Sequence, residues 1–245
     1  MEMIRDRVPS LPTIVLPGLT RVHALLIVAV IAVFLPLDMH LDLPGQAVLS
    51  FAVWGVLFYV LAPMRPRERW ILWACVVIAT AGELALSLMW GLYTYRLGNI
   101  PFFVPAGHAL LLALAFAAAP RVPRVAADVV MVMVVVYALI TAALGVDTFG
   151  LVLLVLLAVL ALGAPAHRPL FATSFLLALA MELYGTMLGN WTWVHQVPML
   201  PLVTTNPPGL AGVFYVALDV LVAFAASTAL SPRRPQAACV DPSTP

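Results

Sequence analysis

The chain is built from apolar runs that are long enough to cross a lipid bilayer, and short polar breaks separate them. A membrane-crossing helix needs about 20 mostly apolar residues, and somewhat shorter or longer runs are tolerated. Prolines fall at or between the run ends, where a helix is expected to stop or restart. The runs are 22–37, 46–62, 70–90, 102–119, 125–144, 148–162, 169–189 and 209–230. The pattern predicts an all-α fold: a polytopic integral membrane helix bundle with about eight transmembrane helices.

Composition supports this fold class and excludes others. Hydrophobic residues make up 64% of the chain, charged residues only 9%, and the mean hydropathy is +1.07. A soluble domain needs far more charge to cover its surface. The formal net charge of +1 indicates neither nucleic acid nor an acidic partner, so membrane lipids are the expected surroundings. The first and sixth runs are short, and seven spans result if one run is re-entrant.

The arginines give an independent test of the span count. Cytoplasmic loops of membrane proteins are enriched in Lys and Arg. With eight spans, all of the 12 basic residues except Arg96 fall on one side. We therefore expect a multi-pass protein of the cell membrane, the inner membrane in a bacterium, with cytoplasmic N- and C-termini. Its expected parts are a cytoplasmic segment 1–21, a transmembrane bundle 22–230 and a disordered cytoplasmic tail 231–245. The first run lacks a convincing cleavage site and is expected to be retained.

Two stretches of the chain resemble each other. In the first, Glu83 is followed by Tyr93-Thr-Tyr95 and then by prolines; in the second, Glu182 is followed by Trp191-Thr-Trp193 and then by prolines. Each glutamate lies 13 positions after its run begins, on the third and the seventh run. This favours a parallel four-plus-four repeat with halves of about 22–119 and 125–230. Chance similarity in so biased a composition is the alternative.

Ionisable residues within the runs are few, and this makes them informative. Such groups are costly in a bilayer and usually face a bundle interior or a cavity. The candidates for catalysis are Glu83, Glu182, Asp219 and His108. Because burial disfavours a charged carboxylate, one glutamate is expected to be protonated and to act as an acid, and a second carboxylate to act as a base. The alternative is that these acids are hydrogen-bonded contacts between helices.

Helical spacing places small residues on the same stripes as the acids. Glu182 aligns with Gly185 and Gly189, a spacing that ordinarily indicates close helix packing. On the last run, Gly212 and Tyr215 align with Asp219. The pattern predicts a polar pocket in the outer half of the bundle.

The aromatic residues have two interpretations. Tyr and Trp collect at membrane interfaces, which alone explains the two aromatic-Thr-aromatic triplets. The functional interpretation is that they wall a pocket and contact an unsaturated or cationic ligand. His195, which follows the second triplet, is expected at the surface. The candidate substrate-binding residues are Tyr93, Tyr95, Trp191, Trp193, Tyr215 and Asn206.

No metal or cofactor is expected. The chain lacks an HExxH motif, a histidine pair at helical spacing, a GxGxxG loop and a Walker loop. Cys75 lies in an apolar run and Cys239 in the polar tail, so neither a disulfide nor a thiolate site is expected.

The two stretches that begin at Glu83 and Glu182, with their aromatic triplets and the following Pro101 and Pro198, resemble multispan carotenoid-biosynthesis membrane proteins that include carotenoid hydratases. The chain departs from that family's pattern at 105–108 and 206–209. The resemblance implies an isoprenoid or polyene substrate that enters from the lipid. It also implies that a carboxylic acid protonates a double bond and that water adds to the cation.

The sequence thus favours a membrane-embedded acid/base enzyme of the lyase or hydratase type, which acts on a lipid, isoprenoid or carotenoid. Two alternatives stay open: a small-solute transporter or channel lined by the same residues, and a non-catalytic subunit of a membrane complex. The sequence allows an oligomer.

Overall fold

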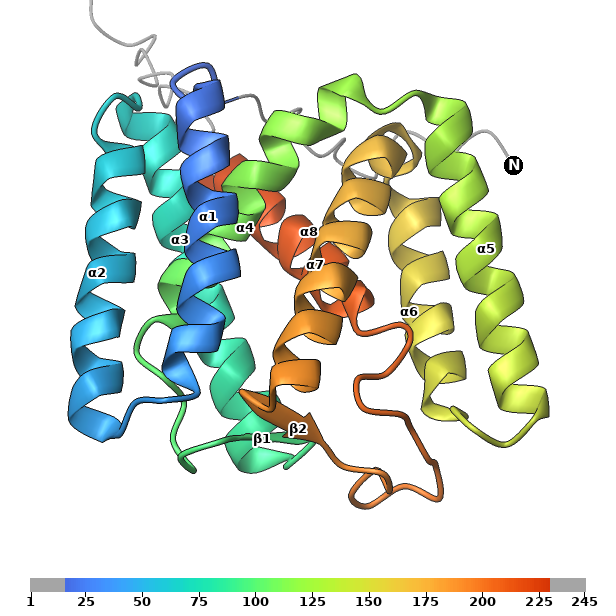
Figure 1. Ribbon diagram of the computed structural model, residues 1–245. Helices are drawn as coiled ribbons and strands as arrows, with labels where there is room; N and C mark the ends of the chain where they lie inside the picture. The colour runs from blue at the N-terminus through green and yellow to red at the C-terminus, as the bar shows by residue number, and fades with distance from the viewer. Residues whose placement is uncertain (1–15, 230–245) are drawn as a thin grey trace, which may run out of the picture.

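Eight α-helices form a bundle in the computed structural model, which describes residues 16–229 (Figure 1). The predicted tail and most of the predicted N-terminal segment lie outside the described residues. Each helix overlaps one predicted run. The helices are α1 (Arg21–Asp38), α2 (Leu43–Leu61), α3 (Pro66–Glu83), α4 (Val104–Ala118), α5 (Arg124–Ala143), α6 (Phe149–Gly163), α7 (Arg168–Leu188) and α8 (Gly212–Ala229).

Six of the described helices are long and apolar enough to cross a membrane, and α6 and α8 are shorter apolar helices. The helices pack closely because small side chains lie between them. The most buried of the six, α4, places Ala106, Ala109 and Ala113 against its neighbours. Likewise, a Cβ on Gly212 would lie 2.5 Å from the backbone oxygen of Phe175, so only glycine lets α8 approach α7 this closely.

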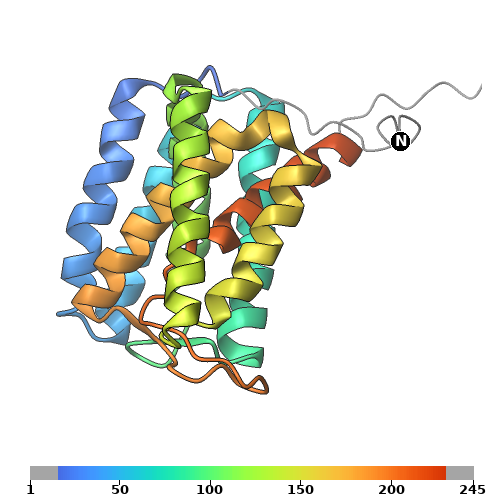
Figure 2. The same ribbon diagram turned by 90° about the vertical axis from the view of Figure 1, so that its right-hand side faces the viewer.

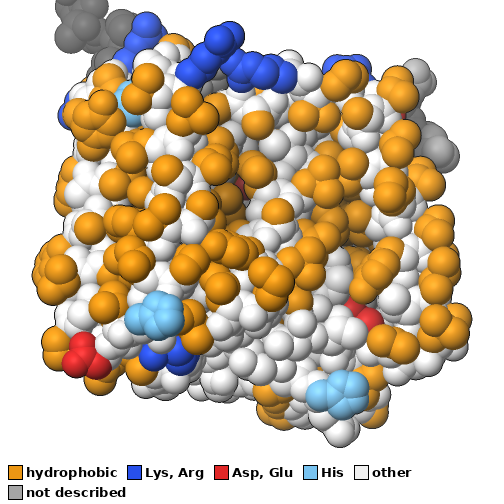
Figure 3. Space-filling view, viewed as in Figure 1, with side chains coloured by type: hydrophobic (Ala, Val, Ile, Leu, Met, Phe, Trp, Pro, Cys, Tyr) orange, Lys and Arg blue, Asp and Glu red, His pale blue; other side chains and the backbone are white. Residues whose placement is uncertain are grey.

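The helices alternate in direction, so arginines gather at one end of the bundle, here called the arginine end (Figure 3). The described part of the chain enters α1 and leaves α8 at this end (Figures 1 and 2). Short 3-10 turns, Ala119–Arg121 and Pro165–His167, connect helices there. The opposite end carries Arg96 and two short strands, and is here called the strand end.

The strand end is closed by β1 (Tyr93–Tyr95) and β2 (Trp191–Trp193), which pair antiparallel although 100 residues separate Tyr93 from its partner Trp193. Successive side chains in a strand point to opposite faces. The aromatic residues of both triplets therefore face into the bundle, and Thr94 and Thr192 are exposed. At this end of the bundle, α3 continues as a π-helix, Leu84–Met89. By contrast, α7 ends at Leu188 and is capped by Gly189, which has a φ of +87°.

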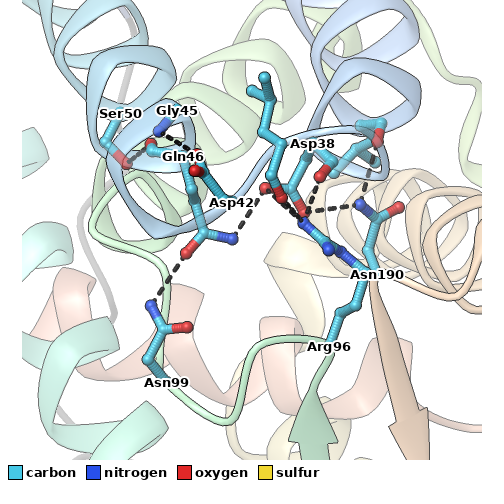
Figure 4. Close-up of polar contacts among 10 residues, drawn as sticks. Asp38, Asp42, Gly45, Gln46, Ser50, Arg96, Asn99 and Asn190 are labelled. Carbon is cyan, nitrogen blue, oxygen red and sulfur yellow. Dashed lines mark hydrogen bonds and ion pairs between the residues drawn. The ribbon is translucent and has the colours of Figure 1, made fainter.

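A buried polar network ties the α1–α2 corner to both strands (Figure 4). Asp38, 1% exposed, accepts hydrogen bonds from the side-chain amides of Gln46 (2.7 Å) and Asn190 (2.9 Å) and lies 4.0 Å from the Arg96 guanidinium. Asn99 in turn donates to the side-chain oxygen of Gln46. Because Arg96 follows β1 and Asn190 precedes β2, this network fixes the outer margin of the strand pair.

We predict that Asp38→Ala lowers the free energy of unfolding by about 3 to 5 kcal/mol, because it removes the buried carboxylate that accepts from Gln46 and Asn190 and lies beside the half-buried Arg96. Unfolding in detergent micelles, followed by circular dichroism, measures the loss. The matched control is Asp42→Ala, which removes only the exposed N-cap of α2 and should cost about 1 kcal/mol. Equal losses in the two variants would contradict a special role for the buried network.

Candidate functional site

A cavity of about 310 Å³ lies in the middle of the bundle, on the inner side of the strand pair. Most of its wall is aliphatic or aromatic, and no arginine is among its lining residues. Of the ten predicted site residues, the structure brings eight to this wall. These are Glu83, Tyr93, Tyr95, His108, Glu182, Trp191, Trp193 and Tyr215.

Glu83 stands at the end of α3, where the helix changes from α to π. Single π turns inside helices are frequent at functional sites, because they shift the direction of the side chains that follow. The hydroxyls of Tyr93 and Tyr95 both donate to its Oε2 atom, each at 2.9 Å. Its other oxygen, Oε1, lies 3.6 Å from Nε2 of His108. Both carboxyl oxygens are therefore oriented by cavity side chains.

Glu182 on α7 is held in the same manner by the other strand. The indole N–H groups of Trp191 and Trp193 donate to its Oε2 atom at 2.7 Å and 3.0 Å. Tyr215 also interacts with this carboxyl group. Because side chains two apart in a strand share a face, an aromatic-Thr-aromatic triplet presents two donors to one carboxylate. Each glutamate is thus bound by the strand that follows it in the sequence.

Burial keeps the tyrosine donors neutral. Desolvation raises the pKa of Tyr93 and of Tyr95, and the neighbouring charge of Glu83 raises both further. Both hydroxyls therefore keep their protons and donate to Glu83 at any physiological pH.

His108 is oriented from two sides. Its Nδ1 atom lies 2.9 Å from the carbonyl oxygen of Val104, which can only accept, so Nδ1 carries a proton. Nε2 is the ring nitrogen that faces Oε1 of Glu83. The imidazole ring stacks on Tyr215 at 5.0 Å between ring centres, with 7° between their planes.

The structure does not bring Asp219 and Asn206 to the cavity. Asp219 is buried on α8 beside Ser174, and a separate space of about 10 Å³ lies between these residues, His108 and Tyr215. Asn206 is exposed; its side-chain oxygen accepts from the backbone N–H of Trp193 and so supports β2. His195 is exposed, at the position expected from the sequence.

Gly185 has a different role from the one its spacing indicates. A Cβ at Gly185 would lie 2.0 Å from the indole ring of Trp191, so this glycine makes room for the aromatic donor of Glu182 and not for a neighbouring helix. Gly189 ends α7 in a left-handed conformation, which glycine adopts at little cost.

Several features of the site escaped the sequence reasoning. Among them are the pairing of the two triplets, the π segment after Glu83 and the network around Asp38. Asp147, in the connection between α5 and α6, is fully buried and accepts from the backbone N–H groups of Gly150 and Gly209. The near-identical triplets were the one signal for the strand pairing.

Within residues 16–229, no group of three or more His, Cys, Asp or Glu side chains is arranged to hold a metal ion. Searches of protein-family models, of curated proteins and of solved structures found no match to the chain. The chemistry of the site therefore has to be inferred from its own geometry.

We predict that Gly185→Ala displaces the Trp191 indole from Glu182, because the added methyl group would overlap the ring. The displacement should shift the tryptophan emission to longer wavelength and lower the unfolding midpoint in detergent. Gly55→Ala is the matched control: a Cβ there meets nothing within 4 Å on helix α2, so stability should stay equal or rise. An unchanged emission spectrum in Gly185→Ala would contradict the assignment.

Proposed function

We propose that the chain is a multi-pass membrane protein in which all eight helices cross the bilayer and the arginine end is cytoplasmic. The alternation of helix directions supports this topology, since α6 and α8 must also cross if every arginine-rich connection is to lie on one side. α6 has 15 residues and is about 22 Å long, which is short for a helix that crosses a bilayer. Its crossing requires a locally thinner bilayer, or polar residues next to its ends that reach the headgroups.

Cysteine labelling tests the crossing of α6, in a chain whose Cys239 is replaced by Ser. Val146→Cys, at the strand end, should react with a membrane-impermeant maleimide in intact cells. Ala166→Cys, at the arginine end, should react only after permeabilisation. Labelling of both positions in intact cells would show that α6 does not cross.

We further propose that the protein is a membrane-embedded acid/base enzyme that acts on an isoprenoid or polyene. The observation that carries this proposal is the pair of buried carboxyl groups, each bound by two aromatic donors and facing one apolar cavity. A carboxyl group that only joins two helices needs a single hydrogen-bond partner on the neighbouring helix. Here, four donors orient two carboxyl groups toward the same cavity. The resemblance to carotenoid hydratases supports the same substrate class.

The proposed chemistry is addition of water to a carbon–carbon double bond. Glu182, which makes no ion pair within residues 16–229, is the proposed acid: the π electron pair of the double bond forms a C–H bond to its proton, the glutamate keeps the O–H electrons, and a carbocation is left on the other carbon. The faces of the surrounding Tyr and Trp rings stabilise that cation. A water molecule then forms the C–O bond and loses a proton to Glu83, whose carboxylate His108 supports. The net change is the gain of one water molecule.

Glu83→Gln and Glu182→Gln test the proposal in purified protein supplied with an acyclic C40 polyene in detergent or vesicles. Each variant should lose at least about 100-fold in turnover, because each removes one proton-transfer group. The unfolding midpoint and the lipid extracted from the purified protein should stay unchanged.

Asp128→Asn is the matched control, since Asp128 is exposed and pairs with Arg168 at the arginine end, away from the cavity. It should retain full turnover. Retained hydration activity in both glutamate variants would contradict the acid/base assignment. Loss of solute flux in vesicles without any chemical conversion would instead favour a transporter.

A further inference from the structure

The cavity reaches two opposite flanks of the bundle. Its lining residues come from α1 and α7 on one side and from α3 and α8 on the other. In Figures 1 and 2, α1 and the strand-end half of α7 lie on one face of the molecule, whereas α3 and the arginine-end half of α8 lie toward the opposite face. The lining of the cavity therefore extends from one face of the bundle toward the other.

The first flank is open between α1 and α7. Ile31 and Met181 line the cavity and are also partly exposed on this face. Figure 3 shows a hollow between these two helices at mid-height. The helices are joined nearby by the Tyr184 hydroxyl, which donates to the carbonyl oxygen of Ala32 at 2.9 Å. Contact here is sparse, and side chains of the cavity wall reach the surface.

At the second flank α3 and α8 pack against each other, and side chains of the cavity wall reach the surface along their line of contact. Leu221 lines the cavity and is 52% exposed, and Ala85 in the π segment is likewise both lining and exposed. Between them, Gly82 has no side chain, and a Cβ placed there would meet nothing within 4 Å. Small residues thus leave a gap on the lipid-facing side of α3.

The volume limits what the cavity can enclose. At about 310 Å³ it lies at the lower end of the range for small-molecule sites, about 300–1,000 Å³, and so holds only a segment of a long isoprenoid. The aliphatic walls at both flanks suit hydrocarbon that continues into lipid on either side. The two glutamates and their aromatic donors lie along the strand-end wall between the flanks.

We propose that the cavity is a transverse tunnel through which a linear isoprenoid chain is threaded, with the reacting double bond at the glutamates and both ends in the lipid. This inference rests on the proposed function for the reaction, but the path itself is a separate property of the fold. It defines the substrate class as a chain longer than the bundle is thick, with at least one end free of rings or bulky polar groups.

Blocking each flank separately tests the tunnel. Met181→Trp should close the α1–α7 flank, and Ala85→Trp the α3–α8 flank. Each variant alone should reduce turnover of an acyclic C40 polyene at least tenfold, but leave turnover of a C10 analogue within twofold, because the short chain fits between the flanks. If only one of the two blocks affects the C40 chain, the cavity is a pocket with a single mouth, and the tunnel is excluded.

The neighbouring positions provide matched controls. Leu183→Trp and Leu84→Trp add the same ring to exposed positions on the same helices, but neither residue lines the cavity. Both variants should turn over the C40 chain at the rate of the unaltered protein. Equal losses in the controls would show that the added ring acts on folding and would overturn the blocking result.

A labelling experiment separates the path from the chemistry. A photoactivatable long-chain fatty acid, with its diazirine at mid-chain, is dissolved in vesicles that contain the protein, and its crosslinks are mapped by mass spectrometry. Crosslinks to the buried lining residue Leu110 should persist in each single blocked variant, because the chain can enter by the other flank, and should be lost when both flanks are blocked together. That result, together with full activity in the Glu→Gln variants, would support the tunnel and contradict the proposed acid/base function. Loss of the interior crosslinks in one single blocked variant would show that the cavity has one mouth and would reject the tunnel.

Discussion

The site depends on hydrogen bonds that make two buried carboxyl groups tolerable in an apolar bundle. A carboxylate without partners is too costly to keep charged in such surroundings. Four aromatic donors, two for each glutamate, supply the missing partners and remain apolar on their faces. The same side chains therefore satisfy the acids and provide a cavity surface that suits hydrocarbon.

The two halves of the site are similar in pattern but differ in detail. Glu83 is bound by phenols, faces a histidine and is followed by a π segment; Glu182 is bound by indoles and is followed by a regular helix end. Phenol O–H and indole N–H both donate, but only a phenol also accepts. This asymmetry suits the proposed assignment of one carboxyl as acid and the other as base, and the four-plus-four repeat stays a prediction.

Much of the fold was predictable, because bilayer-length apolar runs and prolines mark helices with little ambiguity. Every described helix overlaps a predicted run, and the predicted lining residues Glu83 and Glu182 share one cavity. The rest depends on tertiary contacts that no local pattern encodes. The position of Asp219 behind His108 and Tyr215 follows from the tilt of α8. The role of Gly185 follows from the position of an indole that is six residues away in the sequence but folds back on it.

The two paired strands are synthesised at different times, because about 100 residues separate them in the sequence. β1 leaves the ribosome about 100 residues before β2, so its backbone groups have no strand partner until the chain has been made through α7 to β2. The wall of the cavity is then among the last parts to form, since long-range pairing must wait for the intervening chain. A chain that stops before β2 would leave the first glutamate in an open, wet bundle, which is a state that a quality-control protease could recognise.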